Sequence, residues 1–236
     1  MTKPLLLLLP GLLCDEASWN AQIDALQSTR CVVPTYGRCA SIADMARAVL
    51  STLPAQRFAV AGHSMGGRVA LEIMRQAPDR VERIALLDSG IGALDGGEAG
   101  KRERAQRMAW LRLAQEHGMR ALGRDWARGM VHPAHLDAAV FEQILAMIER
   151  KTPEVFEAQI EALLARPDAS DTWRGIACPT LLLCGRQDAW SPLSRHAQMH
   201  AMLPSAQLVV IEDAGHFAMM EQPAAVSRAL ADWLRR

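Results

Sequence analysis

The sequence predicts an α/β fold in which a mainly parallel sheet of six strands is flanked by helices and interrupted by a helical insertion. Two observations lead to this fold class. Unbroken apolar runs of strand length alternate with segments whose apolar residues recur at helical spacing. The alternation stops over residues 90–170, where helical periodicity continues without a convincing strand, and then resumes. Strands that are apolar throughout are typical of parallel sheets, which helices cover on both faces.

The first half of the chain carries four of the expected strands. Segments of helical spacing separate these strands, which lie at residues 5–9, 31–34, 58–63 and 84–88. One such segment covers 42–53, where Ser41 and Asp44 resemble a capping box that uses Asp in place of Glu. After the insertion, the pattern predicts two more strands, at 179–184 and 207–211, and helices at 192–203 and 223–234.

The insertion divides the chain into two expected units. We assign residues 1–89 and 171–236 to the core and residues 90–170 to a helical cap, with helices near 105–116, 136–150 and 153–164. This cap is either a small subdomain packed on itself or a lid over a pocket. The sequence leaves open which of its Met and Trp side chains face a pocket: Met108, Trp110, Met119, Trp126, Met130 and Met147.

The totals favour a small-molecule substrate. The chain has 236 residues, enough for one α/β domain with an insertion. Lys plus Arg and Asp plus Glu are both 26, so no net charge favours nucleic acid or an acidic membrane as a partner. The totals give no expectation for the oligomeric state.

Compartment signals are sparse. Leu5 to Leu9 is too short for the apolar core of a secretory signal, and no apolar segment approaches a membrane span. The cysteines are an odd, scattered set that suits reduced thiols: Cys14, Cys31, Cys39, Cys178 and Cys184. We therefore expect a cytoplasmic protein that does not associate with a membrane.

Ser64 is the candidate nucleophile. It lies in Gly62-His63-Ser64-Met65-Gly66-Gly67, where the apolar run 58–63 changes to helical spacing. A serine on a sharp strand-to-helix turn projects its hydroxyl outward, and the flanking glycines leave room for the backbone. A serine hydroxyl needs a base to take its proton, and that base needs a carboxylate. Asp188 and His216 fit, because each follows an expected strand and the carboxyl ends of parallel strands share one edge.

The chain resembles the α/β-hydrolases, in particular the small serine hydrolases related to carboxylesterases, enol-lactonases and carbon-carbon bond hydrolases. The resemblance covers nearly the whole length and rests on five motifs: Leu9-Pro10-Gly11, Gly62-His63-Ser64-Met65-Gly66-Gly67, Gly185-Arg186-Gln187-Asp188, Gly215-His216 and Met220-Glu221-Gln222-Pro223. It implies the α/β-hydrolase fold, with Ser64 as nucleophile, His216 as general base and acid, and Asp188 orienting His216. It further implies an oxyanion hole made by the backbone N–H groups of Leu12 and Met65.

Two departures from the family pattern bear on the fold. Pro10 stands before Gly11 where many relatives have His. The chain also begins directly at the strand before this loop, without the antiparallel strands that usually open the fold. We therefore expect six strands in the spatial order 2-1-3-4-5-6.

For several other residues the sequence allows either a functional or a structural role. Asp88 is an alternative acid, although relatives usually draw it from the following strand. Cys14 is a candidate for the pocket wall because it lies in the oxyanion loop, and Trp190 and Phe217 either border the pocket or pack in the core. His63 and Arg68 are expected to be structural. The His132/His135 and His196/His200 pairs lack a further ligand in a known pattern, so we expect no metal and no cofactor.

The expected function is that of a serine hydrolase cleaving a small, largely apolar ester, thioester or lactone through an acyl-enzyme. The alternative is carbon-carbon bond hydrolysis of a vinylogous diketone, which would need polar groups for a substrate carboxylate. Arg112, Arg124 and Arg128 of the insertion are candidates for that role. A non-catalytic binding protein on the same fold is a third possibility.

Overall fold

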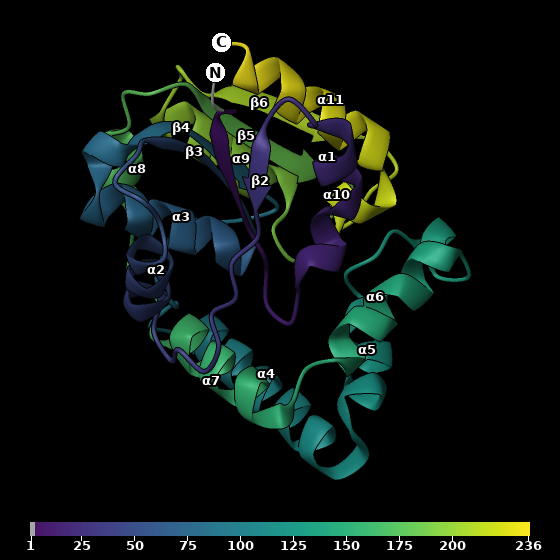
Figure 1. The fold of residues 1–236 in the computed structure, drawn as a ribbon. Helices are drawn as coiled ribbons and strands as arrows, with labels where there is room; N and C mark the ends of the chain where they lie inside the picture. The colour runs from purple at the N-terminus through teal and green to yellow at the C-terminus, as the bar shows by residue number, and fades with distance from the viewer. Residues whose placement is uncertain (1–2) are drawn as a thin grey trace.

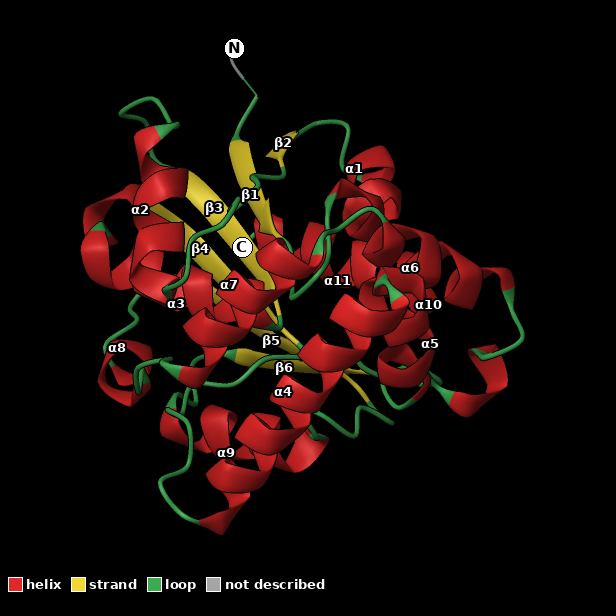
Figure 2. Ribbon diagram, turned by 90° about the horizontal axis from the view of Figure 1, so that it is seen from below, coloured by secondary structure: helices red, strands yellow, loops and turns green. Residues whose placement is uncertain are grey.

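The computed structural model describes residues 3–236. Its centre is a six-stranded parallel sheet with the strand order β2-β1-β3-β4-β5-β6, as the sequence predicts (Figures 1 and 2). The strands are β1 (Leu5–Leu9), β2 (Arg30–Val32), β3 (Phe58–His63), β4 (Val81–Leu87), β5 (Thr180–Gly185) and β6 (Gln207–Ile211).

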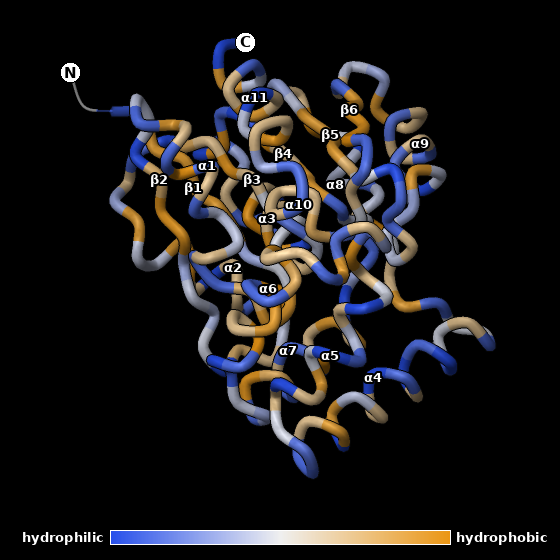
Figure 3. The backbone as a smooth tube through the Cα atoms, turned by 90° about the vertical axis from the view of Figure 1, so that its right-hand side faces the viewer, coloured by the Kyte–Doolittle hydropathy of each residue, from blue (hydrophilic) through white to orange (hydrophobic). Residues whose placement is uncertain are grey.

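Alternate residues of each strand supply two hydrophobic cores, one on each face of the sheet. Leu5, Leu7 and Leu9 of β1 pack on one face, and Leu6 and Leu8 pack on the other. All five are buried, which explains why the run contains no polar position. The strands accordingly lie among the orange, apolar parts of the chain in Figure 3.

Helices cover both faces of the sheet (Figures 1 and 2). The face with Leu6 and Leu8 packs against the short helix η1 (Glu16–Trp19) and the helices α1 (Asn20–Ala25), α10 (Ala218–Glu221) and α11 (Pro223–Leu234). The opposite face packs against α2 (Ile42–Ser51), α3 (Met65–Gln76) and α9 (Leu193–Met202). A further short helix, η2 (Pro78–Arg80), leads into β4.

A helical segment separates β4 from β5. It contains α4 (Glu98–His117), α5 (Met119–Arg128), η3 (Pro133–His135), α6 (Ala139–Glu149), α7 (Pro153–Leu164) and α8 (Ser170–Arg174). Helices α4 to α7 lie together at the bottom of Figure 1, whereas α8 packs against α3. Many residues of α4 are hydrophilic, and they appear as blue parts of this helix in Figure 3.

Local sequence signals predicted most of the elements, but not all of them. The bounds of α7 and α11 agree with the expected ranges, and the Ser41 hydroxyl accepts the N–H of Asp44 at the start of α2, as the cap motif predicts. The sequence did not indicate α5 or α10. Gly118 separates α4 from α5 with a φ of 84°, and only four residues form α10, so neither helix shows a long periodic pattern.

Candidate active site

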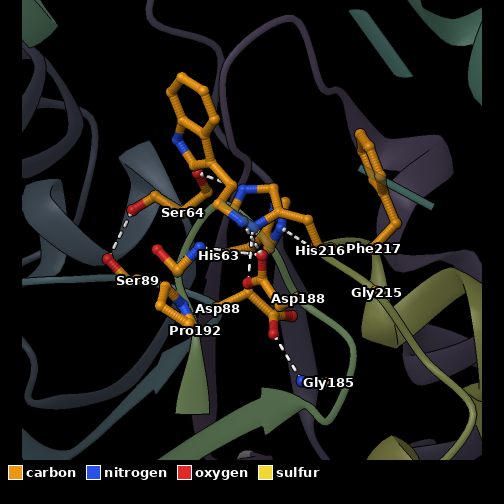
Figure 4. Close-up of polar contacts among 12 residues, drawn as sticks. His63, Ser64, Asp88, Ser89, Gly185, Asp188, Pro192, Gly215, His216 and Phe217 are labelled. Atoms are coloured by element: carbon orange, nitrogen blue, oxygen red, sulfur yellow. Dashed lines mark hydrogen bonds and ion pairs between the residues drawn. The ribbon is translucent and has the colours of Figure 1, made fainter. Parts of the chain in front are cut away.

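Ser64, His216 and Asp188 meet at the carboxyl edge of the sheet (Figure 4). Ser64 follows β3, Asp188 follows β5 and His216 follows β6. The Ser64 Oγ lies 2.9 Å from His216 Nε2, and His216 Nδ1 lies 2.8 Å from Asp188 Oδ2. Because a carboxylate can only accept, the Nδ1–H of His216 donates to Asp188, which leaves Nε2 as the acceptor for the hydroxyl proton of Ser64.

A strained turn presents the Ser64 hydroxyl. Ser64 has φ 53° and ψ −114°, and its N–H donates to Leu87 O of the neighbouring strand at 2.9 Å. A side chain is disfavoured at this φ, and such strain is often stored at functional positions. Glycine is required on both sides, because a Cβ on Gly62 would lie 2.2 Å from Gly66 O and a Cβ on Gly66 would lie 2.2 Å from Leu9 O. The turn therefore depends on this residue pattern.

The carboxylate of Asp188 is held in place by the backbone that follows it. Its Oδ1 accepts the N–H groups of Trp190 at 2.8 Å and Ser191 at 2.9 Å. Burial by itself would raise the pKa of this carboxyl, but the charge and hydrogen bond of His216 and the two N–H groups outweigh it and lower the pKa. Asp188 is therefore ionised and fixed in orientation.

The second buried carboxyl at this edge is Asp88. Its Oδ1 accepts the N–H of Gly185 at 2.8 Å, and among the described residues its buried Oδ2 has no partner. Burial, and then the charge of Asp188, raise the pKa of Asp88 well above its usual range, which favours the neutral form of this carboxyl. It is Asp188, and not Asp88, that contacts His216.

Two backbone contacts hold His216. His63 Nε2 donates to the His216 carbonyl oxygen at 2.7 Å, and the N–H of His216 donates to Met130 O at 2.6 Å. Burial lowers the pKa of His63 to about 3, with a further contribution from His216, so His63 is neutral. The ring of His63 points to the backbone carbonyl of His216 and not to Ser64, consistent with the structural role that the sequence suggested.

The carboxylate of Glu221 accepts hydrogen bonds from the backbone of the same loop. Its Oε1 accepts the N–H groups of Gly215 at 2.9 Å and Phe217 at 3.3 Å, and its Oε2 accepts the N–H of His132 at 2.7 Å. The Oε2 atom also lies 3.0 Å from His135 Nδ1. Glu221 thus joins the loop that carries His216 to the helical segment between β4 and β5. Its motif, Met220-Glu221-Gln222-Pro223, was visible in the sequence, but its role was not.

A cavity of 480 Å³ opens at Ser64. Residues of the sheet edge and of the helical segment line it, including Leu12, Ser64, Met65 and His216 together with Trp126 and Trp190. Met65 is the first residue of α3, where backbone N–H groups have no partner within the helix. Within residues 3–236, the N–H of Leu12 likewise has no protein acceptor. Two backbone donors are therefore available beside the Ser64 hydroxyl.

The cavity wall also carries several charged side chains. Five arginines and a single glutamate line it: Arg68, Arg102, Arg107, Arg166, Arg195 and Glu103. Glu103 pairs with Arg107 at 2.9 Å and with Arg166 at 2.7 Å. Among the described residues, Arg68, Arg102 and Arg195 have no carboxylate partner. The cavity therefore carries an excess of positive charge.

Arg68 lies one helical turn after Ser64. Its Nη1 donates to Gly92 O at 2.7 Å. Desolvation and the nearby charges of Arg166 and Arg195 lower the pKa of Arg68 to about 9, which leaves it protonated at pH 7. Repulsion among neighbouring cations is unfavourable while the cavity is empty, and a bound anion would relieve it.

The sequence pattern of the Alpha/beta hydrolase family matches residues 6–229, which is nearly the whole chain. The chain belongs to the α/β-hydrolase family. This membership, expected from the motifs around Ser64, Asp188 and His216, makes the protein a hydrolase enzyme.

Relatives of this α/β-hydrolase include enzymes of more than one activity. It is 28% identical to 2-succinyl-6-hydroxy-2,4-cyclohexadiene-1-carboxylate synthase of Klebsiella pneumoniae, over 98% of this chain and 94% of that protein. A malate-bound structure of a thermophilic esterase from Thermogutta terrifontis superposes with a TM-score of 0.88 at 28% identity, covering 99% of this chain and 90% of that one. The enol-lactonase from Burkholderia xenovorans LB400 shares the fold, with a TM-score of 0.85, 22% identity and coverage of 100% and 93%.

The hydrolase cavity contains some of the expected wall residues and lacks others. Trp126 and Trp190 line it, with Leu12 and Met65. Cys14, Met130 and Phe217, which were also expected in the pocket wall, are not among the residues that line this cavity. Cys14 lines a different cavity, the carbonyl oxygen of Met130 accepts the N–H of His216, and the ring of Phe217 points away from Ser64 (Figure 4).

The arginines of the hydrolase cavity are the main residues that sequence reasoning missed. Arg112, Arg124 and Arg128, the three suggested for a substrate carboxylate, are all exposed and do not line it. Arg68, expected to be structural, does line it. One signal could have found Arg68: residues four apart on a helix share a face, so it lies on the face next to Ser64. For Arg107 and Arg166, nothing in the sequence indicates which helix face points to the cavity.

Over residues 3–236, no group of three or more His, Cys, Asp and Glu side chains is arranged to hold a metal ion. None of the helices in this part of the chain is both long and apolar enough to span a membrane.

Proposed function

We propose that this chain is a serine hydrolase with the triad Ser64, His216 and Asp188, acting on a small carbonyl substrate that carries a carboxylate. The hydrogen-bonded chain from Ser64 Oγ through His216 to Asp188, with contacts of 2.9 and 2.8 Å, carries the proposal. This geometry supplies a nucleophile, a base within reach of its proton, and a carboxylate that fixes the tautomer of the base.

The reaction follows from these positions. Ser64 Oγ attacks the carbonyl carbon of an ester, thioester or lactone while its proton passes to His216 Nε2. The N–H groups of Leu12 and Met65 stabilise the negative oxygen, each contributing roughly a hundred- to a thousandfold in rate. His216 then gives its proton to the leaving oxygen or sulfur. Finally, His216 takes a proton from water while the water oxygen attacks the acyl-enzyme, and His216 returns this proton to Ser64 Oγ as the bond between Oγ and the acyl carbon breaks and the acid leaves.

The charge of the cavity supports a carboxylate on the substrate. A largely apolar substrate, which the sequence suggested, would leave the desolvated guanidinium group of Arg68 in the cavity wall without an anion. A carboxylate accepts two parallel hydrogen bonds from one guanidinium and offsets the repulsion among the arginines. The names of two relatives agree with this chemistry, because one makes a cyclohexadiene carboxylate and the other was solved with bound malate, a dicarboxylate.

We further propose that residues 90–170 act as a lid. Trp126, Arg107 and Arg166 of this segment line the cavity at Ser64, Met130 O accepts the N–H of His216, and the N–H of His132 donates to Glu221. A lid that carries cationic side chains both excludes water and selects anions.

The arginines of the cavity are also compatible with a second function, carbon-carbon bond hydrolysis. Carbon-carbon bond hydrolysis of a vinylogous diketone uses the same three residues and needs cationic groups for the substrate carboxylate, which Arg68 and Arg166 would supply.

Two matched esters test the proposal. The rates of hydrolysis of 4-nitrophenyl hexanoate and 4-nitrophenyl hydrogen adipate are measured for the parent, Ser64→Ala, Asp188→Ala and His216→Ala. We expect the parent to prefer the adipate ester in kcat/KM and all three variants to lose most of the rate. A fluorophosphonate probe should label the parent and leave Ser64→Ala unlabelled.

The outcomes separate the candidates. Full activity in Ser64→Ala, or labelling that does not need Ser64, contradicts the assigned nucleophile. A preference for the hexanoate ester contradicts the carboxylate. Labelling of Ser64 without turnover of either ester favours carbon-carbon bond hydrolysis, and the absence of both labelling and turnover favours a binding protein.

A further inference from the structure

The loop after β1 is held in a turn that its sequence does not favour. The N–H of Cys14 donates to Gly11 O at 3.1 Å and closes a four-residue turn. Leu13, the third residue of this turn, has a φ of 61°, a region that favours glycine. Leu13 is fully buried, so water cannot satisfy its N–H. Another part of the chain must therefore hold the turn.

Gln159 provides this support. Its Oε1 accepts the N–H of Leu13 at 2.9 Å, across 146 positions of sequence. Gln159 lies on α7 and is only 5% exposed. The carbonyl oxygen at the other end of the same peptide group, Leu12 O, accepts the Sγ–H of Cys14 at 3.4 Å. The peptide between Leu12 and Leu13 is thus held from both sides.

This peptide adjoins the proposed oxyanion donor. Leu12 lines the cavity beside Ser64, and within residues 3–236 its N–H has no protein acceptor. If the Leu12–Leu13 peptide rotated, Leu13 could return to a negative φ, and the backbone on both sides of Leu12 would move with it. A displacement of about 1 Å in catalytic geometry can reduce the rate by roughly a hundredfold.

A second contact fixes the same loop to the same helical segment. Asp15, which directly follows the turn and caps η1, pairs with Arg150 at 2.9 Å and Lys151 at 3.1 Å. Residues 150, 151 and 159 all belong to the segment between β4 and β5, which contains none of the three triad residues. The oxyanion loop therefore takes its conformation partly from this distant segment.

We propose that Gln159 is a positioning residue that sets the oxyanion loop by holding the Leu13 N–H. This inference rests on the proposed function. Gln159 does not line the cavity at Ser64, so it acts through Leu13 and Leu12 and not on the substrate. Its loss should therefore reduce stabilisation of the negative oxygen while leaving substrate binding intact.

The test compares Gln159→Leu, which has no acceptor, with Gln159→Glu, which keeps an oxygen at the same reach. Ile160→Ala is the matched control, because it removes a buried side chain of α7 that does not bond to Leu13. For each variant, kcat and KM on the preferred ester, inhibition by an alkyl boronic acid that forms a tetrahedral adduct, and the unfolding temperature are measured.

We expect Gln159→Leu to lose about 10- to 100-fold in kcat, with KM within threefold of the parent and a matching rise in the boronic acid Ki. Gln159→Glu should retain most of the rate, and Ile160→Ala should lower the unfolding temperature with little change in kcat. Parent rates in Gln159→Leu overturn the inference, as does an equal loss of kcat in Gln159→Glu or Ile160→Ala. Failure of the proposed function itself is recognised separately, by activity that survives Ser64→Ala.

Discussion

Replacing Arg68 by Met should weaken the reaction with anionic substrates and leave neutral esters nearly unchanged. Met fills much of the volume of the Arg side chain and removes its charge and its N–H groups. Arg68 donates to Gly92 O through one nitrogen, and within residues 3–236 it has no carboxylate partner. The remaining N–H groups are therefore available to a substrate carboxylate at the cavity wall.

The expected magnitude follows from the kind of bond that is lost. A hydrogen bond to a charged group contributes about 1.5–3 kcal/mol, which corresponds to roughly 10- to 150-fold in kcat/KM. Arg166 and Arg195 remain near the site, so we expect the lower part of this range. The same two charges repel Arg68 in the empty cavity, and the unfolding temperature of Arg68→Met without ligand should therefore not fall.

The assay is the ratio of kcat/KM for 4-nitrophenyl hydrogen adipate to that for 4-nitrophenyl hexanoate, measured in the parent and in Arg68→Met. Raising the salt concentration should reduce the ratio in the parent more than in the variant, because salt screens the attraction. A ratio that is the same in both proteins, or an equal loss on both esters, would refute the reasoning. Arg112→Met, an exposed arginine outside the cavity, serves as the control.

Three further predictions concern buried groups. Burial lowers the pKa of His63 to about 3 and of His196 to about 4, whereas both take up a proton near pH 6.5 when unfolded. The free energy of unfolding should therefore fall by about 2 kcal/mol for each histidine between pH 7.5 and 5, and urea unfolding that shows no change over this range would contradict it. Asp188→Asn should reduce kcat by about 10³- to 10⁴-fold, because the wrong tautomer of the base is favoured. Asp88→Asn should stay near the parent rate, since burial favours the neutral form of Asp88 and Asn is also neutral. Equal losses in the two variants would mean that Asp88 and Asp188 had been assigned the wrong way round. Gly66→Ala should destabilise the fold by about 3 kcal/mol, because its Cβ would overlap Leu9 O, and an unchanged thermal midpoint would disprove this.

Most of the sheet could be predicted because its signals are local. The run Leu5 to Leu9 contains enough apolar residues to define a buried strand without reference to any other segment. The turn at Ser64 was visible for the same reason, since Gly62 and Gly66 are needed by contacts within a few residues and with the adjacent strand. The strand order 2-1-3-4-5-6 came from the family resemblance, and the sheet has it.

The meeting of Ser64, Asp188 and His216 was also expected from the sequence, although more than a hundred residues separate Ser64 from the other two. Each follows a parallel strand, and parallel strands bring their carboxyl ends to one edge whatever the loops between them do. The meeting of these three residues can therefore be predicted from the parallel topology of the sheet, without knowledge of how the side chains pack. The supporting contacts of Glu221 and Gln159 had no such basis, because each depends on how a loop meets a distant helix.

The character of the cavity was decided by tertiary structure alone. Arg107 and Arg112 both lie on α4, five residues apart. They therefore lie on different faces of the helix, and of the two only Arg107 lines the cavity. Nothing in the periodicity of α4 distinguishes them, because the helix is polar over much of its surface and its orientation is set by contacts with α5 and α7. The sequence by itself determined the sheet and the three residues at its edge, through short-range patterns and parallel topology. Only the packing of the helical segment decided that arginines surround Ser64, because a helix face is chosen by its neighbours in space.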